Sequence, residues 1–108
     1  MVTTDKKLLG LLGLARRAGK LDLGADVAVQ SLRKNRAKLL LLACDLSRRT
    51  AEKMEAEAES AGVRCRRTGA DMDALGAALG KRTGVIAVSD AGFAKALLAL
   101  CAEERGGI

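Results

Sequence analysis

The sequence contains no histidine, proline, tryptophan or tyrosine, and its only aromatic residue is Phe93. Without histidine, neither a Ser/His nor a Cys/His nucleophile–base pair can be assembled. Hydrolase, metalloprotease and kinase motifs are also missing from the sequence. Because 49% of the 108 residues are hydrophobic and almost none are aromatic, the core has to be aliphatic. These absences favour a binding protein over an enzyme.

Cysteine and long hydrophobic runs are equally scarce. The three cysteines show no C-x-x-C spacing, which argues against a disulfide framework or a zinc site and is typical of a reducing compartment. We expect Cys44 and Cys65 to be small buried hydrophobic side chains. The longest apolar run, residues 39–44, is far below the roughly 18 residues that span a bilayer. We therefore expect a cytoplasmic protein with no membrane partner.

One glycine-rich stretch, residues 13–20, has some likeness to a phosphate-binding loop. Five residues separate Gly13 from Gly19, however, and Leu21 follows Lys20 where the loop requires Ser or Thr. The stretch also lies at the end of a predicted helix, which reverses the strand–loop–helix order of such sites. We expect no nucleotide, metal or other cofactor.

Positive charge is concentrated in the first third of the chain. Residues 1–38 carry nine Lys/Arg and three Asp, which accounts for the whole net charge of +6, while the remaining residues are balanced. A basic segment of this kind favours a polyanion such as nucleic acid as the partner. A solvated charged surface that keeps a Leu-rich protein soluble is the alternative.

Hydrophobic periodicity and capping residues predict helices over about 5–18, 25–33, 47–61, 71–79 and 91–102. Short apolar runs at 21–23, 39–43, 63–67 and 85–89 predict strands between them. This alternation indicates one α/β domain over residues 1–108, a three-layer α/β/α sandwich on a parallel or mixed sheet. Residues 103–108 are expected to be a frayed tail.

The start of the second predicted helix has the chemistry of a phosphate site. Gly24 lets another backbone approach closely, the first-turn amides point outward, and the helix dipole favours an anion. Basic residues surround this helix in the sequence. Since stacking platforms need exposed aromatics, a structured RNA held through its phosphates is the favoured ligand. Alternatively, Gly24 only permits a turn and the basic residues are solvated.

Several ordered motifs resemble one known family. They are Leu11-Leu12-Gly13-Leu14-Ala15-Arg16-Arg17-Ala18-Gly19-Lys20-Leu21, Gly24, Ala37-Lys38-Leu39, Ala43-x-Asp45, Leu75-Gly76-x-x-x-Gly80-Lys81 and Val88-x-Asp90-x-Gly92-Phe93-Ala94-Lys95. Together they span about residues 7–97 and resemble the kink-turn-binding ribosomal protein superfamily, in particular its bacterial YlxQ group of small stand-alone members. The resemblance implies a single-domain α/β/α sandwich with a mixed four-stranded sheet, and structured RNA, ribosomal RNA included, as the partner.

The resemblance also implies two regions of RNA contact. In the family, a G-x-N-E-x-x-K stretch opens the second helix, and only its glycine is kept in residues 24–30. Asp26 can only accept hydrogen bonds where an amide would also donate, and Gln30 lacks a phosphate-pairing charge. The second region is the loop 81–85 after the fourth helix, here basic. The predicted RNA-binding residues are Lys20, Gly24, Ala25, Asp26, Gln30, Arg33, Lys34, Lys81, Arg82 and Thr83.

The alternative function is a protein–protein interaction module, because the family resemblance extends to stress proteins that bind protein partners. An exposed apolar surface at Leu8, Leu9 and Leu12, or a self-associating acidic third helix, would favour it. The outer stripe of that helix, with Glu52 and Glu55 among its members, is expected to face away from RNA. Since related domains are fused to RNA methyltransferases, an enzyme-associated substrate module is a third and weaker alternative.

Overall fold

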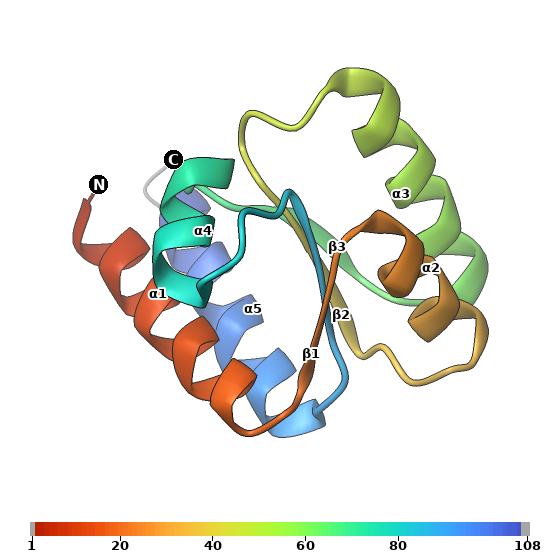
Figure 1. Cartoon of the computed structure of the whole chain (residues 1–108), viewed down its shortest axis with the longest axis horizontal. Helices are drawn as coiled ribbons and strands as arrows, with labels where there is room; N and C mark the ends of the chain where they lie inside the picture. Colours follow the sequence, from red (N-terminus) through yellow and green to blue (C-terminus); the bar gives the residue numbers. More distant parts are fainter. Residues whose placement is uncertain (1, 107–108) are drawn as a thin grey trace.

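The computed structural model describes the backbone of residues 2–106 and the side chains of residues 6–101. Helices and strands alternate along this part of the chain (Figure 1). In chain order they are α1 (Val2–Arg17), β1 (Leu21–Leu23), α2 (Ala25–Arg33), β2 (Leu39–Leu42), α3 (Arg48–Ala61), β3 (Cys65–Arg67), α4 (Met72–Leu79), β4 (Val85–Val88) and α5 (Ala91–Gly106). The predicted order of elements is confirmed.

The strands form one mixed sheet in the order β1-β4-β2-β3. β4 pairs antiparallel with β1 and with β2, so that Val88 lies opposite both Leu21 and Leu39. β3 pairs parallel with β2, Leu40 facing Cys65. Strands β1, β2 and β3 therefore run in one direction and β4 runs in the opposite direction. The predicted mixed four-stranded sheet is confirmed.

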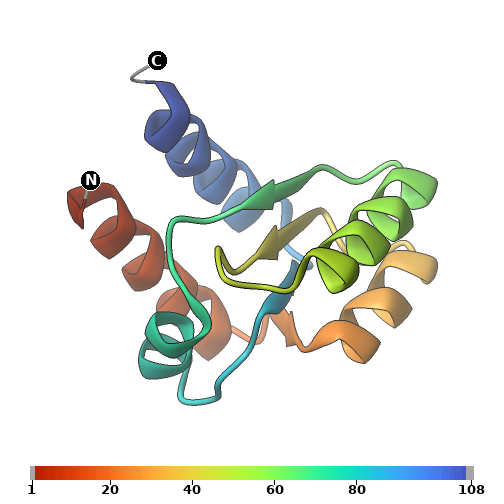
Figure 2. The ribbon, with the colours of Figure 1, turned by 90° about the horizontal axis from the view of Figure 1, so that it is seen from above.

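Helices cover both faces of the sheet, which confirms the three-layer sandwich. α1, α4 and α5 pack on one face, and α2 and α3 pack on the other (Figure 2). Side chains alternate across each strand, so Leu39 and Leu41 enter the first core while Leu40 and Leu42 enter the second. All four leucines are buried. The core is aliphatic, and Phe93 is only partly buried against it.

Predicted capping residues determine where α3 and α4 begin and end. The Ser47 hydroxyl accepts a hydrogen bond from the Thr50 amide at 3.3 Å, and the Asp71 carboxylate accepts one from the Ala74 amide at 2.8 Å. Gly62 and Gly80 follow the last helical residues in the left-handed conformation. Local sequence is sufficient to specify these two helices.

The burial of the cysteines and the end of the last helix bear on two expectations from the sequence. Cys44 is exposed rather than buried, because β2 ends at Leu42 and leaves this residue beyond the sheet, whereas Cys65 on β3 is half-buried. The backbone of α5 continues to Gly106, while the side chains of the expected frayed tail lie outside the described residues. Within residues 2–106, no helix is long and apolar enough to cross a membrane.

Candidate nucleic-acid interface

The direction of the strands separates the predicted RNA-binding residues into two groups. At one end of the sheet lie residues 24–27, which open α2, and residues 80–85, which lead into β4; we call this the Gly24 end. At the other end lie Lys20, immediately before β1, and Lys34, which follows α2. α2 has nine residues, so the two groups are separated by about 13 Å of helix. The structure does not bring all the predicted residues together.

Gly24 connects the start of α2 to the loop that leads into β4. Its amide donates a hydrogen bond to the Val85 carbonyl at 2.9 Å, which ties the start of α2 to the loop before β4. Its backbone angles, φ 104° and ψ 153°, lie in a region that only glycine adopts without strain. No side chain caps α2, so its first-turn amides are left to bind an outside acceptor.

The side chains of the first turns of α2 are mixed in character. Asp26 and Gln30 are exposed, and Ala25 is half-buried. Val27 is 43% exposed, one of two large hydrophobic side chains so exposed among the described residues. The face offers an acceptor, an amide and an apolar contact in addition to the backbone donors.

The loop residues 81–83 differ from one another in their surroundings. Lys81 is exposed and forms no ion pair with any described residue. Arg82 donates to the Asp73 carboxylate at 2.9 Å, and this hydrogen bond and the charge of Asp73 raise the pKa of the guanidinium, with Asp45 and Asp71 adding to the effect. Thr83 is buried.

The Thr83 hydroxyl donates to the Val85 carbonyl at 3.0 Å. Since its hydrogen-bonding capacity is directed into the protein, the geometry gives Thr83 a part in shaping the loop. Lys81 is the loop side chain best placed to meet a phosphate.

Two glycines allow the loop to lie close to its neighbours. A Cβ atom on Gly76 of α4 would lie 3.0 Å from the Cα atom of Arg82, and one on Gly84 would lie 2.7 Å from the Leu46 Cδ1 atom. The first contact is with backbone, which cannot move aside as a flexible side chain can. The absence of these side chains therefore determines where the loop runs.

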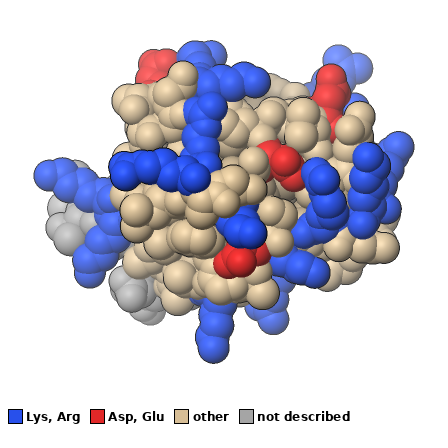
Figure 3. All heavy atoms as spheres, turned by 60° about the horizontal axis from the view of Figure 1, so that its bottom comes forward, with Lys and Arg blue, Asp and Glu red and all other residues tan. Residues whose placement is uncertain are grey.

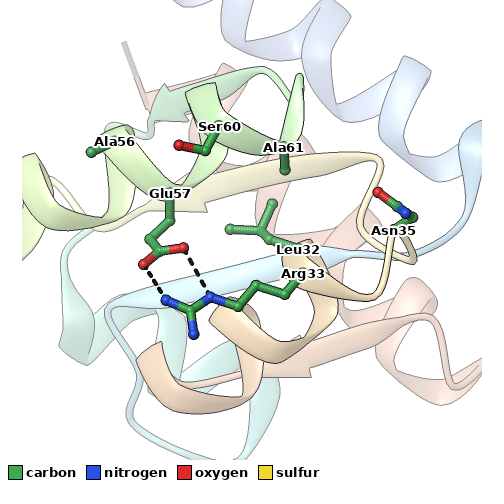
Figure 4. Close-up of a pocket in the computed structure, with 7 residues that line it drawn as sticks. All are labelled: Leu32, Arg33, Asn35, Ala56, Glu57, Ser60 and Ala61. Carbon is green, nitrogen blue, oxygen red and sulfur yellow. Dashed lines mark hydrogen bonds and ion pairs between the residues drawn. The ribbon is translucent and has the colours of Figure 1, made fainter.

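Arg33 pairs with an acidic residue that sequence reasoning did not assign to it. Its guanidinium donates to Glu57 of α3 at 2.9 and 3.4 Å across a hollow between the two helices (Figure 4). The hydrogen bond and then the charge of Glu57 raise the pKa of Arg33. Glu52, Glu55 and Glu59 are exposed. An RNA phosphate would have to compete with Glu57 for Arg33.

The exposed apolar surface at Leu8, Leu9 and Leu12 that would favour a protein-binding module is not formed. Leu8 and Leu12 are fully buried against the sheet and α5, and Leu9 is partly buried. Leu14 is 53% exposed instead, beside a shallow apolar hollow that includes Leu11 and Leu100. Two of the three leucines, Leu8 and Leu12, thus lie on the face of α1 that packs against the core.

Comparison with known protein families identifies the class of protein to which this fold belongs. Residues 6–98 match the model of the ribosomal protein L7Ae/L30e/S12e/Gadd45 family, and the chain belongs to that family. The family resemblance seen in the sequence is thereby confirmed.

Particular relatives agree with this assignment. RNA-binding protein YlxQ of Bacillus subtilis (strain 168) is 40% identical over 91 residues, which make up 83% of this chain and 90% of the relative. RNA-binding protein YlxQ of Enterococcus faecium is 32% identical over 90 residues, 83% and 86% of the two chains. The chain is thus similar to the YlxQ group, as its motifs indicated.

Solved structures share the fold. A protein of unknown function from Bacillus halodurans C superimposes with a TM-score of 0.83 at 35% identity, over 88% of this chain and 96% of that one. The Giardia lamblia 15.5kD RNA binding protein superimposes with a TM-score of 0.77 at 17% identity, over 98% and 91%. The second likeness shows the fold alone.

Proposed function

We propose that this protein binds structured RNA without catalysing a reaction, and that the Gly24 end is its main contact surface. The observation that carries the proposal is the 2.9 Å hydrogen bond from the Gly24 amide to the Val85 carbonyl. It places the uncapped start of α2 beside the loop 81–85, the two regions that the family resemblance assigns to RNA. The names of the YlxQ relatives support RNA as the ligand.

The chemistry of this surface favours a folded RNA over a single strand. First-turn amides of α2 bind a phosphate or another acceptor, and Lys81 adds charge. Val27 packs on a sugar or a base face. Stacked single-stranded recognition would need exposed aromatics, and the one aromatic side chain, Phe93, packs against the core.

A kink-turn or a kinked ribosomal RNA segment is the form of RNA that we propose. With Asp26, Val27 and Gln30 in place of the polar family residues, base-specific contacts are fewer and phosphate contacts carry more of the affinity. The selectivity for a kink-turn is therefore smaller than it would be with the full family motif, and the affinity depends more steeply on salt.

The test is the affinity of the full chain for a kink-turn RNA, a plain RNA duplex of equal length and a DNA duplex, each measured across a salt series. We expect the kink-turn to bind most tightly at every salt concentration. Equal and steeply salt-dependent binding to all three would reduce the interaction to general electrostatics. The absence of binding to any of them would exclude the RNA function and favour a protein partner at the Leu14 surface.

A variant that restores the motif locates the surface. Asp26→Asn, Val27→Glu and Gln30→Lys together should raise the affinity for the kink-turn RNA by about tenfold, since they restore a donor, a polar contact and a charge. The plain duplex should gain only the smaller contribution of the added charge. An unchanged ratio between the two RNAs would mean that α2 does not meet the kinked strand.

A further inference from the structure

Three cations from separate parts of the chain meet at the end of the sheet opposite the Gly24 end. Lys38 immediately precedes β2, Arg64 immediately precedes β3, and Lys95 lies in the first turns of α5. All three are exposed and line one hollow, whose floor includes Ala94 and other apolar atoms. We call this cluster of Lys38, Arg64 and Lys95 the Lys38 end.

Its side chains have no partners among the described residues. None of the three forms an ion pair with residues 6–101. Asp22 is already paired with Arg36 at 3.3 Å, and the Asp90 carboxylate caps α5 by accepting from the Phe93 amide at 2.8 Å. The three cations of the cluster are therefore not held in ion pairs within this part of the protein.

One further cation, Lys20, lies beside the cluster. The Lys20 carbonyl accepts a hydrogen bond from the Ser89 amide at 2.9 Å, and the Lys38 amide donates to the Val88 carbonyl at 2.7 Å, so both residues adjoin the end of β4. Figure 3, turned so that the bottom of Figure 1 comes forward, shows Lys and Arg spread over this face with few carboxylates between them. The surface is a broad basic face.

We propose that the Lys38 end is a second RNA-binding surface, which holds the phosphate backbone of an arm that extends beyond the segment bound at the Gly24 end. The inference rests on the proposed function and adds a second point of contact to it. Unpaired cations immediately before β2 and β3 and on α5 meet the requirement of a phosphate backbone, which is charge without base-specific geometry.

An acidic protein fits this surface less well. Protein interfaces rely on large apolar or aromatic side chains that become buried at their centre. The large hydrophobic residues exposed among the described residues are Leu14 and Val27, and neither belongs to the Lys38 end. The cluster offers three cations around a small aliphatic floor and no large exposed hydrophobic side chain, which favours a nucleic acid.

The length of the RNA provides the test. The longest extent of the protein is 33 Å, which corresponds to about ten base pairs at 3.4 Å per step. A kink-turn RNA with arms of about three base pairs, roughly 10 Å long, covers the Gly24 end alone, whereas arms of about twenty base pairs can reach both ends. The variant Lys38→Ala/Arg64→Ala/Lys95→Ala removes the cluster.

The matched control removes the same charge elsewhere. Lys6→Ala/Lys7→Ala/Lys53→Ala changes three exposed lysines on α1 and α3, outside both ends of the sheet. Because all six side chains are exposed, both variants should melt at the wild-type temperature, as circular dichroism will check.

We expect the cluster variant to bind the long-armed RNA on the order of tenfold more weakly, with a salt slope smaller by about two to three. Its affinity for the short-armed RNA should stay within about twofold of wild type, and the control should change neither RNA by more than that. This pattern would establish the second surface.

Other outcomes overturn the inference in distinguishable ways. If the cluster variant binds the long-armed RNA as wild type does, the second surface is excluded while the proposed function stands. If the two variants weaken both RNAs equally, only general charge is involved. If wild type binds neither RNA, the proposed function and this inference fail together. If wild type prefers polyglutamate and the cluster variant loses it, the occupant is an acidic protein.

Discussion

The two proposed binding surfaces, at opposite ends of the sheet, are built in opposite ways. At the Gly24 end, several polar side chains are paired within the protein, since Arg82 pairs with Asp73 and the Asp45 carboxylate accepts from the Met72 amide at 2.9 Å, while the first-turn amides of α2 remain uncapped. Gly24, Gly76 and Gly84 determine the path of the backbone there. At the Lys38 end, cations have no partners among residues 6–101, and their positions follow from neighbouring strands. The first surface is suited to recognising shape, and the second to holding charge.

The largest effect is expected when the backbone geometry of the Gly24 end is removed. Gly24→Val places a β-branched residue at φ 104°, which should lower the free energy of unfolding by about 2–3 kcal/mol. Urea denaturation followed by circular dichroism measures the loss. Gly10→Ala is the control, because a Cβ atom there meets nothing within 4 Å in helix α1 and should stabilise the chain slightly. Equal stability of Gly24→Val and wild type would contradict the strained geometry.

A smaller effect is expected from the loop itself. Gly76→Ala introduces a Cβ atom 3.0 Å from the Arg82 backbone, which should lower the free energy of unfolding by about 1–2 kcal/mol and displace residues 81–83. Amide chemical shifts of the loop would report the displacement. We also expect the preference for a kink-turn over a plain duplex to fall. Unchanged loop shifts would show that α4 does not position this loop.

Release of Arg82 from its ion pair should make the Gly24 end resemble the Lys38 end. Asp73→Asn removes the carboxylate that holds the guanidinium, and Arg82 is then available for a phosphate. The affinity for kink-turn and duplex RNA should rise by about threefold, with a steeper salt dependence. Since the pair is exposed, the stability should change by no more than about 0.5 kcal/mol. A salt slope equal to that of wild type would count against a phosphate contact of Arg82.

Alkylation of two cysteines, Cys44 and Cys65, probes the two ends of the sheet without a substitution. Burial, followed by the charge of Glu55, raises the pKa of the Cys65 thiol to about 11, against the opposing effect of Arg66 and Arg67. The thiolate is the reactive form, so raising the pH towards 11 should accelerate alkylation of Cys65. At pH 8 the exposed Cys44 should react first, as mass spectrometry can follow. Faster labelling of Cys65 at pH 8 would contradict its burial.

Much of the fold could be predicted because its determinants are local. The caps at Ser47 and Asp71, the glycines that end α3 and α4, and the buried run at 39–43 are each specified by a few neighbouring residues. The position of Cys44 was predicted wrongly because the apolar run continues past the end of β2. Strand boundaries depend on which residues find partners in the sheet, and a single sequence does not contain that information.

The arrangement of the interface was less predictable for the same reason. Lys20 and Lys34 are close to Gly24 in the sequence, but the direction of β1 and α2 carries them to the other end of the sheet. The partners of Arg33 and Arg82 depend on tertiary packing. Arg64 and Lys95 lie in the charge-balanced part of the chain, and only the strand order places them beside Lys38.

The position of β4 has a consequence for how the chain folds during its synthesis. In the described sheet, β4 is the sole neighbour of β1 and lies between it and β2. A nascent chain that has not yet extended through Val88 therefore cannot join β1 to β2. The four leucines of β2 then lack their backbone hydrogen-bond partners on the β4 side. The domain should form as a single late event, after nearly all of its residues have been synthesised.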